Sequence, residues 1–124
     1  MVREEVQTMS EAAIQREVVK FVKSMVKVDP RYDMLVAIPN GGYRGRAQRQ
    51  GAGFRAGVPD LFLAWSEDLR DPYYAGLFIE LKTPKGAVSA EQLRWHDRLR
   101  WAGYRVVVCR SAQEAIDTIR DYLG

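Results

Sequence analysis

The sequence predicts one α/β domain in which helices flank a small mixed sheet, with the elements in the order αβββαβα. Three observations support this prediction. A length of 124 residues suits a single hydrophobic core. Apolar residues recur at helical spacing near both ends of the chain, and short apolar runs of strand length lie between them. We therefore expect a flexible leader over residues 1–9 and one domain over residues 10–124.

The first helix is predicted from its cap, its apolar stripe and its stop signal. Ser10 is a suitable N-cap, because a serine side chain can accept a hydrogen bond from an unpaired amide of the first turn. The stripe that follows consists of Ile14, Val18, Phe21, Val22 and Met25. We expect this helix to run to about Val28, where Asp29-Pro30 stops it.

Two further helices are predicted from capping-box patterns. Ser89 with Gln92, and Ser111 with Glu114, have the spacing at which the side chain of each residue caps the backbone amide of the other. Gly103 stands where a glycine commonly ends a helix. The two patterns place one helix before the last predicted strand and one after it.

Four apolar runs predict the strands, at residues 34–38, 58–65, 76–82 and 104–109. The polar segment 66–72 fits a hairpin-like connection between the second and third strands. A helix separates the third strand from the fourth, so these two should pair in parallel through a crossover connection. The fourth run is almost entirely apolar, which predicts a strand covered on both faces.

Composition indicates a folded protein without a membrane span or an internal disulfide. Hydrophobic residues make up 47% of the chain, which argues against disorder, and no apolar run approaches the roughly 20 residues that span a bilayer. The single Cys109 cannot form an internal disulfide, so we expect a reducing compartment and a core position for its side chain. The residues before Ser10 lack the apolar segment of a signal peptide. We expect no membrane partner and a cytoplasmic location, in a bacterial or phage-infected cell.

Positive charge is concentrated in one glycine-rich loop. No acidic residue lies between Asp33 and Asp60, and arginines outnumber lysines in the chain by 14 to 5. Arginine offers phosphate a planar, bidentate donor pair, so this loop predicts binding of a nucleic-acid backbone. The alternative is a solvated surface loop. The predicted DNA-binding residues of the loop, together with a lysine in the turn after the third strand, are Asn40, Arg44, Arg46, Arg49, Arg55 and Lys85.

Charged residues also occur in two predicted strands that are otherwise apolar. Asp60 lies in the second strand, and Glu80 and Lys82 share one face of the third. Neighbouring strands lie about 5 Å apart, so the two carboxylates could converge on one cation such as Mg²⁺ or Mn²⁺. Such an ion activates a bound water and neutralises charge on a phosphate, and Lys82 could orient that water. The alternative is a salt-bridged pair at a sheet edge.

Three segments together resemble the virus-type replication-repair nuclease (VRR-NUC) domain of the PD-(D/E)XK superfamily. They are Gly57-Val58-Pro59-Asp60-Leu61, Ile79-Glu80-Leu81-Lys82 and Ser89-Ala90-Glu91-Gln92-Leu93-Arg94-Trp95. The resemblance extends over about residues 10 to 123, and the predicted αβββαβ order is also the core of that superfamily.

The resemblance implies roles for individual residues. Asp60 and Glu80 would be metal ligands, joined by the backbone carbonyl of Leu81, and Lys82 would be the catalytic lysine. The family's glutamine matches Gln92, whose other interpretation is the helix cap. Its acid in the first helix, also a possible metal ligand, matches Glu11 best, with Glu17 as the competing choice. Apart from the resemblance, we expect His96, the only histidine, to be a structural or exposed side chain and not a ligand or a base.

These expectations combine into a metal-dependent, structure-selective DNA endonuclease. The small domain resembles stand-alone members that resolve Holliday junctions as homodimers, with Trp101, Tyr104 or the first helix as candidate interfaces. A flap-cutting or duplex-cutting, restriction-like nuclease is the alternative within the enzyme class. A catalytically inactive DNA-binding module is the alternative outside it, although Asp60, Glu80 and Lys82 are all present.

Overall fold

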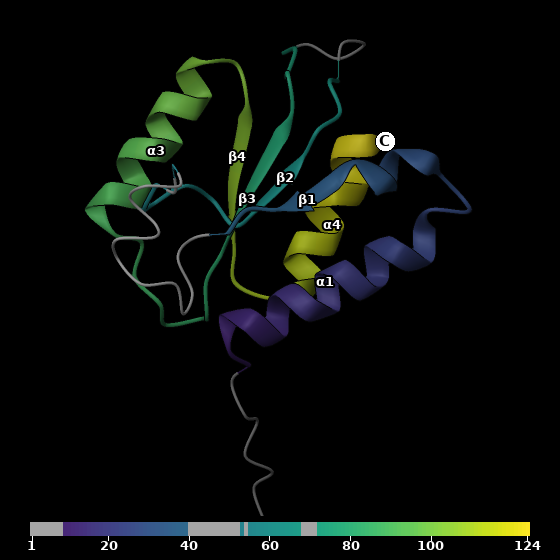
Figure 1. Cartoon of the computed structure of the whole chain (residues 1–124), viewed down its shortest axis with the longest axis horizontal. Helices are drawn as coiled ribbons and strands as arrows, with labels where there is room; N and C mark the ends of the chain where they lie inside the picture. Colours follow the sequence, from purple (N-terminus) through teal and green to yellow (C-terminus); the bar gives the residue numbers. More distant parts are fainter. Residues whose placement is uncertain (1–8, 40–52, 54, 68–71) are drawn as a thin grey trace, which may run out of the picture.

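A computed structural model describes residues 9–39, 53, 55–67 and 72–124. Its elements follow the predicted αβββαβα order, with one short 3₁₀ helix added after the first α-helix (Figure 1). The elements are α1 (Glu11–Met25), the 3₁₀ helix η1 (Pro30–Met34), β1 (Leu35–Ala37), β2 (Leu61–Leu63), β3 (Leu77–Leu81), α3 (Ala90–Trp101), β4 (Arg105–Cys109) and α4 (Ala112–Leu123). No helix in the described part of the chain is long and apolar enough to span a membrane.

The four strands form one mixed sheet in the order β1-β2-β3-β4. The first three are antiparallel neighbours, and β3 pairs with β4 in parallel, which confirms the predicted crossover. The strand β4 lies at one edge of the sheet, and the helices α3 and α4 both contact it from opposite faces, as the apolar run predicted. Val107 and Val108 are partly buried there. The strand buried along its whole length is β3, which lies between β2 and β4.

Several element boundaries differ from the prediction for local reasons. The helix α1 ends at Met25, because the Met25 carbonyl accepts the amides of both Val28 and Asp29 in a closing turn. The Asp29 side chain then caps η1 by accepting the Arg31 amide. The strand β2 is shorter than the predicted run 58–65, which contains Pro59, a residue with no amide hydrogen for a sheet ladder.

The two predicted capping boxes differ in the structure. At α3 both reciprocal bonds form, since Ser89 Oγ accepts the Gln92 amide and Gln92 Oε1 accepts the Ser89 amide. At α4 only the serine bond forms as predicted. The Glu114 carboxylate accepts the amide of Arg110, one residue before the cap, so this second capping box is incomplete.

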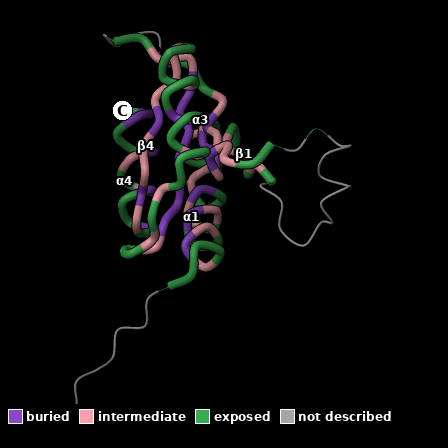
Figure 2. The backbone as a smooth tube through the Cα atoms, turned by 90° about the vertical axis from the view of Figure 1, so that its left-hand side faces the viewer, coloured by how far each residue is buried: buried purple, intermediate pink, exposed green. Residues whose placement is uncertain are grey.

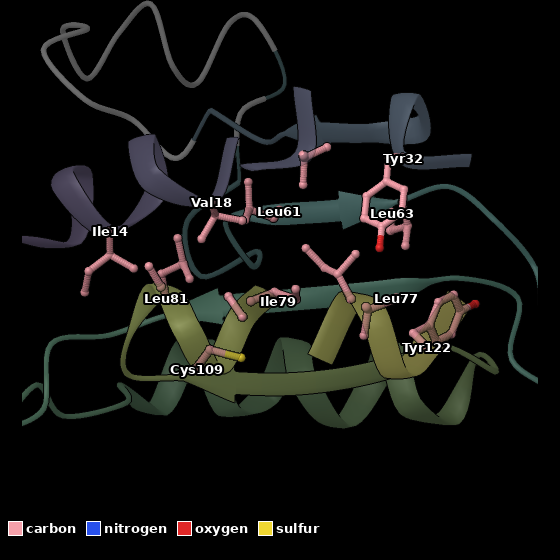
Figure 3. Close-up of a cluster of buried hydrophobic side chains, with 14 of the residues drawn as sticks. Ile14, Val18, Tyr32, Leu61, Leu63, Leu77, Ile79, Leu81, Cys109 and Tyr122 are labelled. Carbon is pink, nitrogen blue, oxygen red and sulfur yellow. The ribbon is translucent and has the colours of Figure 1, made fainter. Parts of the chain in front are cut away.

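The hydrophobic core lies between one face of the sheet and the helices α1 and α4 (Figure 3). Leu77, Ile79 and Leu81 alternate along β3 and project into this core, where Cys109 is buried as expected. The buried positions follow the sheet and the inner sides of these two helices (Figure 2). The helix α3 lies on the opposite side of the sheet (Figure 1). The other residues of β3, Phe78 and Glu80, therefore face α3.

The segment that leads into β2 passes close to α3 at Gly57. This glycine has a φ of +91°, in the left-handed region that disfavours side chains. A Cβ atom at this position would lie 3.0 Å from the Glu91 backbone and 3.0 Å from Cδ1 of Trp95. Gly57 therefore permits both the turn and the close approach, three residues before Asp60.

We predict that Gly57→Ala destabilises the fold more than Gly103→Ala does. Gly103 has a similar φ of +100°, but a Cβ atom there would meet nothing within 4 Å. Gly103→Ala should cost about 1–2 kcal/mol from backbone strain alone. Gly57→Ala carries the same strain and also displaces α3, so its cost should be larger. Urea unfolding of both variants measures the difference, and equal losses of stability would contradict the close approach.

Candidate active site

The two predicted metal-binding carboxylates face each other across neighbouring strands. Leu61 pairs with Ile79 in the antiparallel register, and one further step of this register places Asp60 opposite Glu80. Directly opposed residues of an antiparallel pair project from the same face of a sheet. Oδ2 of Asp60 accepts the Leu81 amide at 2.7 Å, which fixes the aspartate carboxylate beside the end of β3.

Glu80 carries its carboxyl group inside the protein, with only 1% of the residue exposed. Burial, followed by the hydrogen bond and the charge of Asp60, raises the pKa of Glu80 to about 9. Lys82 opposes this increase, and Glu11 adds to it. Two ionised carboxylates are thus unfavourable here without a compensating cation, and a bound divalent ion would supply that compensation.

The donor atoms at this point fit a hard divalent cation. Beside the two carboxylates, the ladder between β2 and β3 ends at Leu61 and Ile79, and Pro59 has no amide that could extend it to the Leu81 carbonyl. Two carboxylates and a carbonyl oxygen suit Mg²⁺ or Mn²⁺, which retain several waters. Among the described residues, no group of three or more His, Cys, Asp or Glu side chains gathers as a metal site. Water and phosphate oxygens would complete the coordination.

Lys82 follows β3 and reaches the start of α1. Its Nζ atom lies 3.8 Å from Oε1 of Glu11, and the residue is only 9% exposed. The structure therefore brings Glu11 to the site. Glu17 lies elsewhere, where it borders a shallow surface hollow with Phe21 and Ile116.

The side chain of Gln92 serves as the helix cap described above, which is one of its two predicted roles. Its carboxamide oxygen is engaged with the Ser89 amide at 2.9 Å. No described contact joins Gln92 to Asp60, Glu80 or Lys82, so its catalytic role remains a prediction.

His96 belongs to the site, although sequence reasoning did not place it there. The residue is 1% exposed, and its Nε2 atom lies 3.2 Å from Oε1 of Glu80 in hydrogen-bonding contact. Burial and the nearby charge of Arg100 lower the pKa of His96, which favours a neutral ring. The sequence does carry a pattern that indicates the buried side of α3, because Gln92, His96 and Leu99 recur at helical spacing on one side of this helix.

The predicted DNA-binding residues fall into two groups. Asn40, Arg44, Arg46 and Arg49 lie outside the described residues. Of the other two, Arg55 places its guanidinium 5.3 Å from the centre of the Trp95 ring. Lys85 is exposed in the turn directly after Lys82. Arg110 braces this turn by donating to the carbonyls of Thr83, Pro84 and Gly86.

Comparisons with known proteins bear on the family and the fold of the chain. The model of the VRR-NUC domain family matches residues 5–113. A solved structure described as a VRR_NUC domain protein shares the fold with a TM-score of 0.76 at 24% identity, covering 94% of this chain and 90% of its own. Another, described as a VRR_NUC domain, has a TM-score of 0.53 at 20% identity and covers 90% and 94%. No curated protein matches the chain. The two solved structures therefore show that the chain shares their fold.

We predict that Glu80→Gln stabilises the metal-free protein at about pH 8. Between the ordinary pKa of 4.5 and the raised value of about 9, the unfolded chain releases the Glu80 proton while the folded chain retains it. This difference lowers wild-type stability as pH rises, by at most about 1.4 kcal/mol per pH unit. Glutamine does not titrate, so the advantage of the variant should shrink toward pH 5.

Urea unfolding in EDTA across this pH range measures the effect. Glu17→Gln, an equivalent change on the exposed side of α1, is the matched control and should follow the wild-type trend. A Glu80→Gln protein that is less stable than wild type at about pH 8 would contradict the buried, proton-retaining carboxyl.

Proposed function

This chain belongs to the VRR-NUC domain family, whose members are nucleases of the PD-(D/E)XK type, and we propose that it is a metal-dependent, structure-selective DNA endonuclease. The observation that carries the proposal is the opposition of Asp60 and Glu80 beside Lys82. Two facing carboxylates and one ammonium group provide a cation site and a positive charge within reach of a phosphodiester.

The proposed mechanism assigns each residue a task in hydrolysis. Asp60, Glu80 and the Leu81 carbonyl would hold Mg²⁺ or Mn²⁺, which when bound lowers the pKa of water and neutralises phosphate charge. Lys82 holds the attacking water or stabilises the developing negative charge on the phosphate. Glu11 positions the Lys82 ammonium through the ion pair. His96 restrains the Glu80 carboxyl through the hydrogen-bonding contact.

We predict that Asp60→Asn and Lys82→Ala reduce cleavage in different ways. Asparagine keeps an oxygen that can accept the Leu81 amide but removes the ligand charge, so turnover should fall by about a hundredfold or more. Lys82→Ala should also lower turnover by about 10²–10³-fold, while metal affinity is retained.

Thermal unfolding with increasing Mn²⁺ separates the two variants. Metal that binds the folded state raises the melting temperature of wild type and of Lys82→Ala, but not that of Asp60→Asn. Wild-type cleavage rates in Asp60→Asn would overturn the metal assignment, and an unaffected rate in Lys82→Ala would remove its catalytic role.

We propose that the substrate is branched DNA, with a Holliday junction favoured, and that the enzyme acts as a homodimer. Two symmetric cuts across a four-way junction match the symmetry of a twofold dimer. Trp101, which is 91% exposed at the end of α3, is the candidate interface residue. Tyr104 is a poorer candidate, because its ring packs edge-on against Phe62 and Phe78.

Cleavage of a matched set of labelled DNAs tests the substrate preference. The set contains a four-way junction, a 5′ flap, a splayed arm and a linear duplex, each assayed with Mg²⁺, Mn²⁺ or EDTA beside Asp60→Asn. We expect paired symmetric nicks in the junction and sedimentation of the active species as a dimer. Cutting of flap or duplex alone would replace the junction with those substrates. Metal-independent binding without any cutting would favour an inactive DNA-binding module.

A further inference from the structure

Three arginines surround a surface hollow between α3 and the segment that leads into β2. Arg94 and Arg98 are exposed on α3, and Arg55 comes from the segment before β2. The hollow has a volume of about 190 Å³ and is lined by Arg55, Ala56, Glu91, Arg94, Trp95 and Arg98. We call this group of residues the arginine cradle.

The cradle is held together by helix geometry and by one aromatic ring. Glu91, Arg94, Trp95 and Arg98 share a side of α3, since residues three, four and seven apart are neighbours on a helix surface. The guanidinium groups of Arg55 and Arg98 lie 5.3 Å and 5.9 Å from the centre of the Trp95 ring, within the range of cation–π contacts. The close approach at Gly57 brings Arg55 to this ring.

The charges of the cradle are not neutralised within the described part of the chain. None of its three guanidinium groups forms an ion pair there with a carboxylate. Asp97 is three residues along α3 from Arg94, but its nearest cation among the described residues is Arg100, whose Nη1 atom lies 4.0 Å from Oδ1 of Asp97. Among the described residues, Glu91 is the only acid that lines the hollow, so three positive charges face one negative charge there. Such a cluster favours an anion that several guanidinium groups can bind together.

We propose that the arginine cradle binds a backbone phosphate of the DNA, at a position distinct from the scissile phosphate. This inference rests on the proposed nuclease function and adds Arg94 and Arg98 to its binding surface. The cradle borders the segment that leads to Asp60, and the adjoining residue His96 contacts Glu80 from the same helix. A DNA strand that reaches the carboxylates along this segment would pass the cradle, whose contacts to phosphate would carry no base specificity.

The test measures DNA binding by an Asp60→Asn parent, which separates affinity from cleavage. Fluorescence anisotropy in EDTA gives Kd over a range of salt concentrations for the parent and for the same protein carrying Arg94→Gln and Arg98→Gln. Loss of two phosphate contacts should weaken binding about tenfold or more and reduce the slope of log K against log salt by about two. Lys27→Gln with Arg120→Gln removes the same charge from the opposite side of the sheet and should change neither by as much.

Neutral methylphosphonate linkages, placed one at a time along the strand, locate the contact. At one position the substitution should weaken binding of the parent but cause no further loss in the Arg94→Gln, Arg98→Gln protein. The cradle proposal would be overturned by additive losses at every position, or by equal salt slopes for the cradle and control variants. Cleavage by the wild type would still support the proposed nuclease function in that case. A parent that binds no DNA, together with a wild type that cuts none, would overturn both proposals.

Discussion

The opposition of Asp60 and Glu80 is the constraint on which the rest of the site depends. It exists because the antiparallel register pairs Leu61 with Ile79, so the next step places the two acids face to face. That register is held by core side chains of β2 and β3 on the other face of the sheet. A slip of one residue would turn these apolar side chains away from the core and would separate the carboxylates. Hydrophobic packing thus sets the geometry of a polar site that it does not touch.

The same opposition explains why so many polar contacts gather at one end of β3. A buried glutamate beside a second carboxyl is unfavourable without a cation, and each neighbour reduces one part of that difficulty. The Leu81 amide satisfies Asp60, His96 contacts Glu80, and the charge of Lys82 opposes the rise in the Glu80 pKa. Without a cation the buried carboxyl group reduces the stability of the fold, and an ion bound as we propose would remove that penalty.

The sequence predicts features that nearby residues determine, and it does not predict features that depend on contacts between distant elements. The sequence predicts the strand order, the α3 capping box and the facing carboxylates. It can do so because caps form between nearby residues and because side chains alternate along strands. It does not predict the edge position of β4 or the contact of His96 with Glu80, since both depend on which elements become neighbours in space. A single histidine has no partner that the sequence can name, and its position on the inner side of α3 is what brings it to Glu80.

In the proposed enzyme, the helix α3 would link catalysis to DNA binding, because different sides of this helix contact Glu80 and line the arginine cradle. His96 contacts Glu80 on the inner side, and the preceding residue, Trp95, packs near Gly57 and supports the arginine cradle. Adjacent residues on a helix project about 100° apart, so one rigid element can present His96 to Glu80 and Trp95 to the cradle. Movement of α3 would therefore shift the His96 contact and the cradle arginines Arg94 and Arg98 together. DNA seated in the cradle would restrain the same helix that restrains Glu80, which favours productive placement of the phosphate over binding at either point alone.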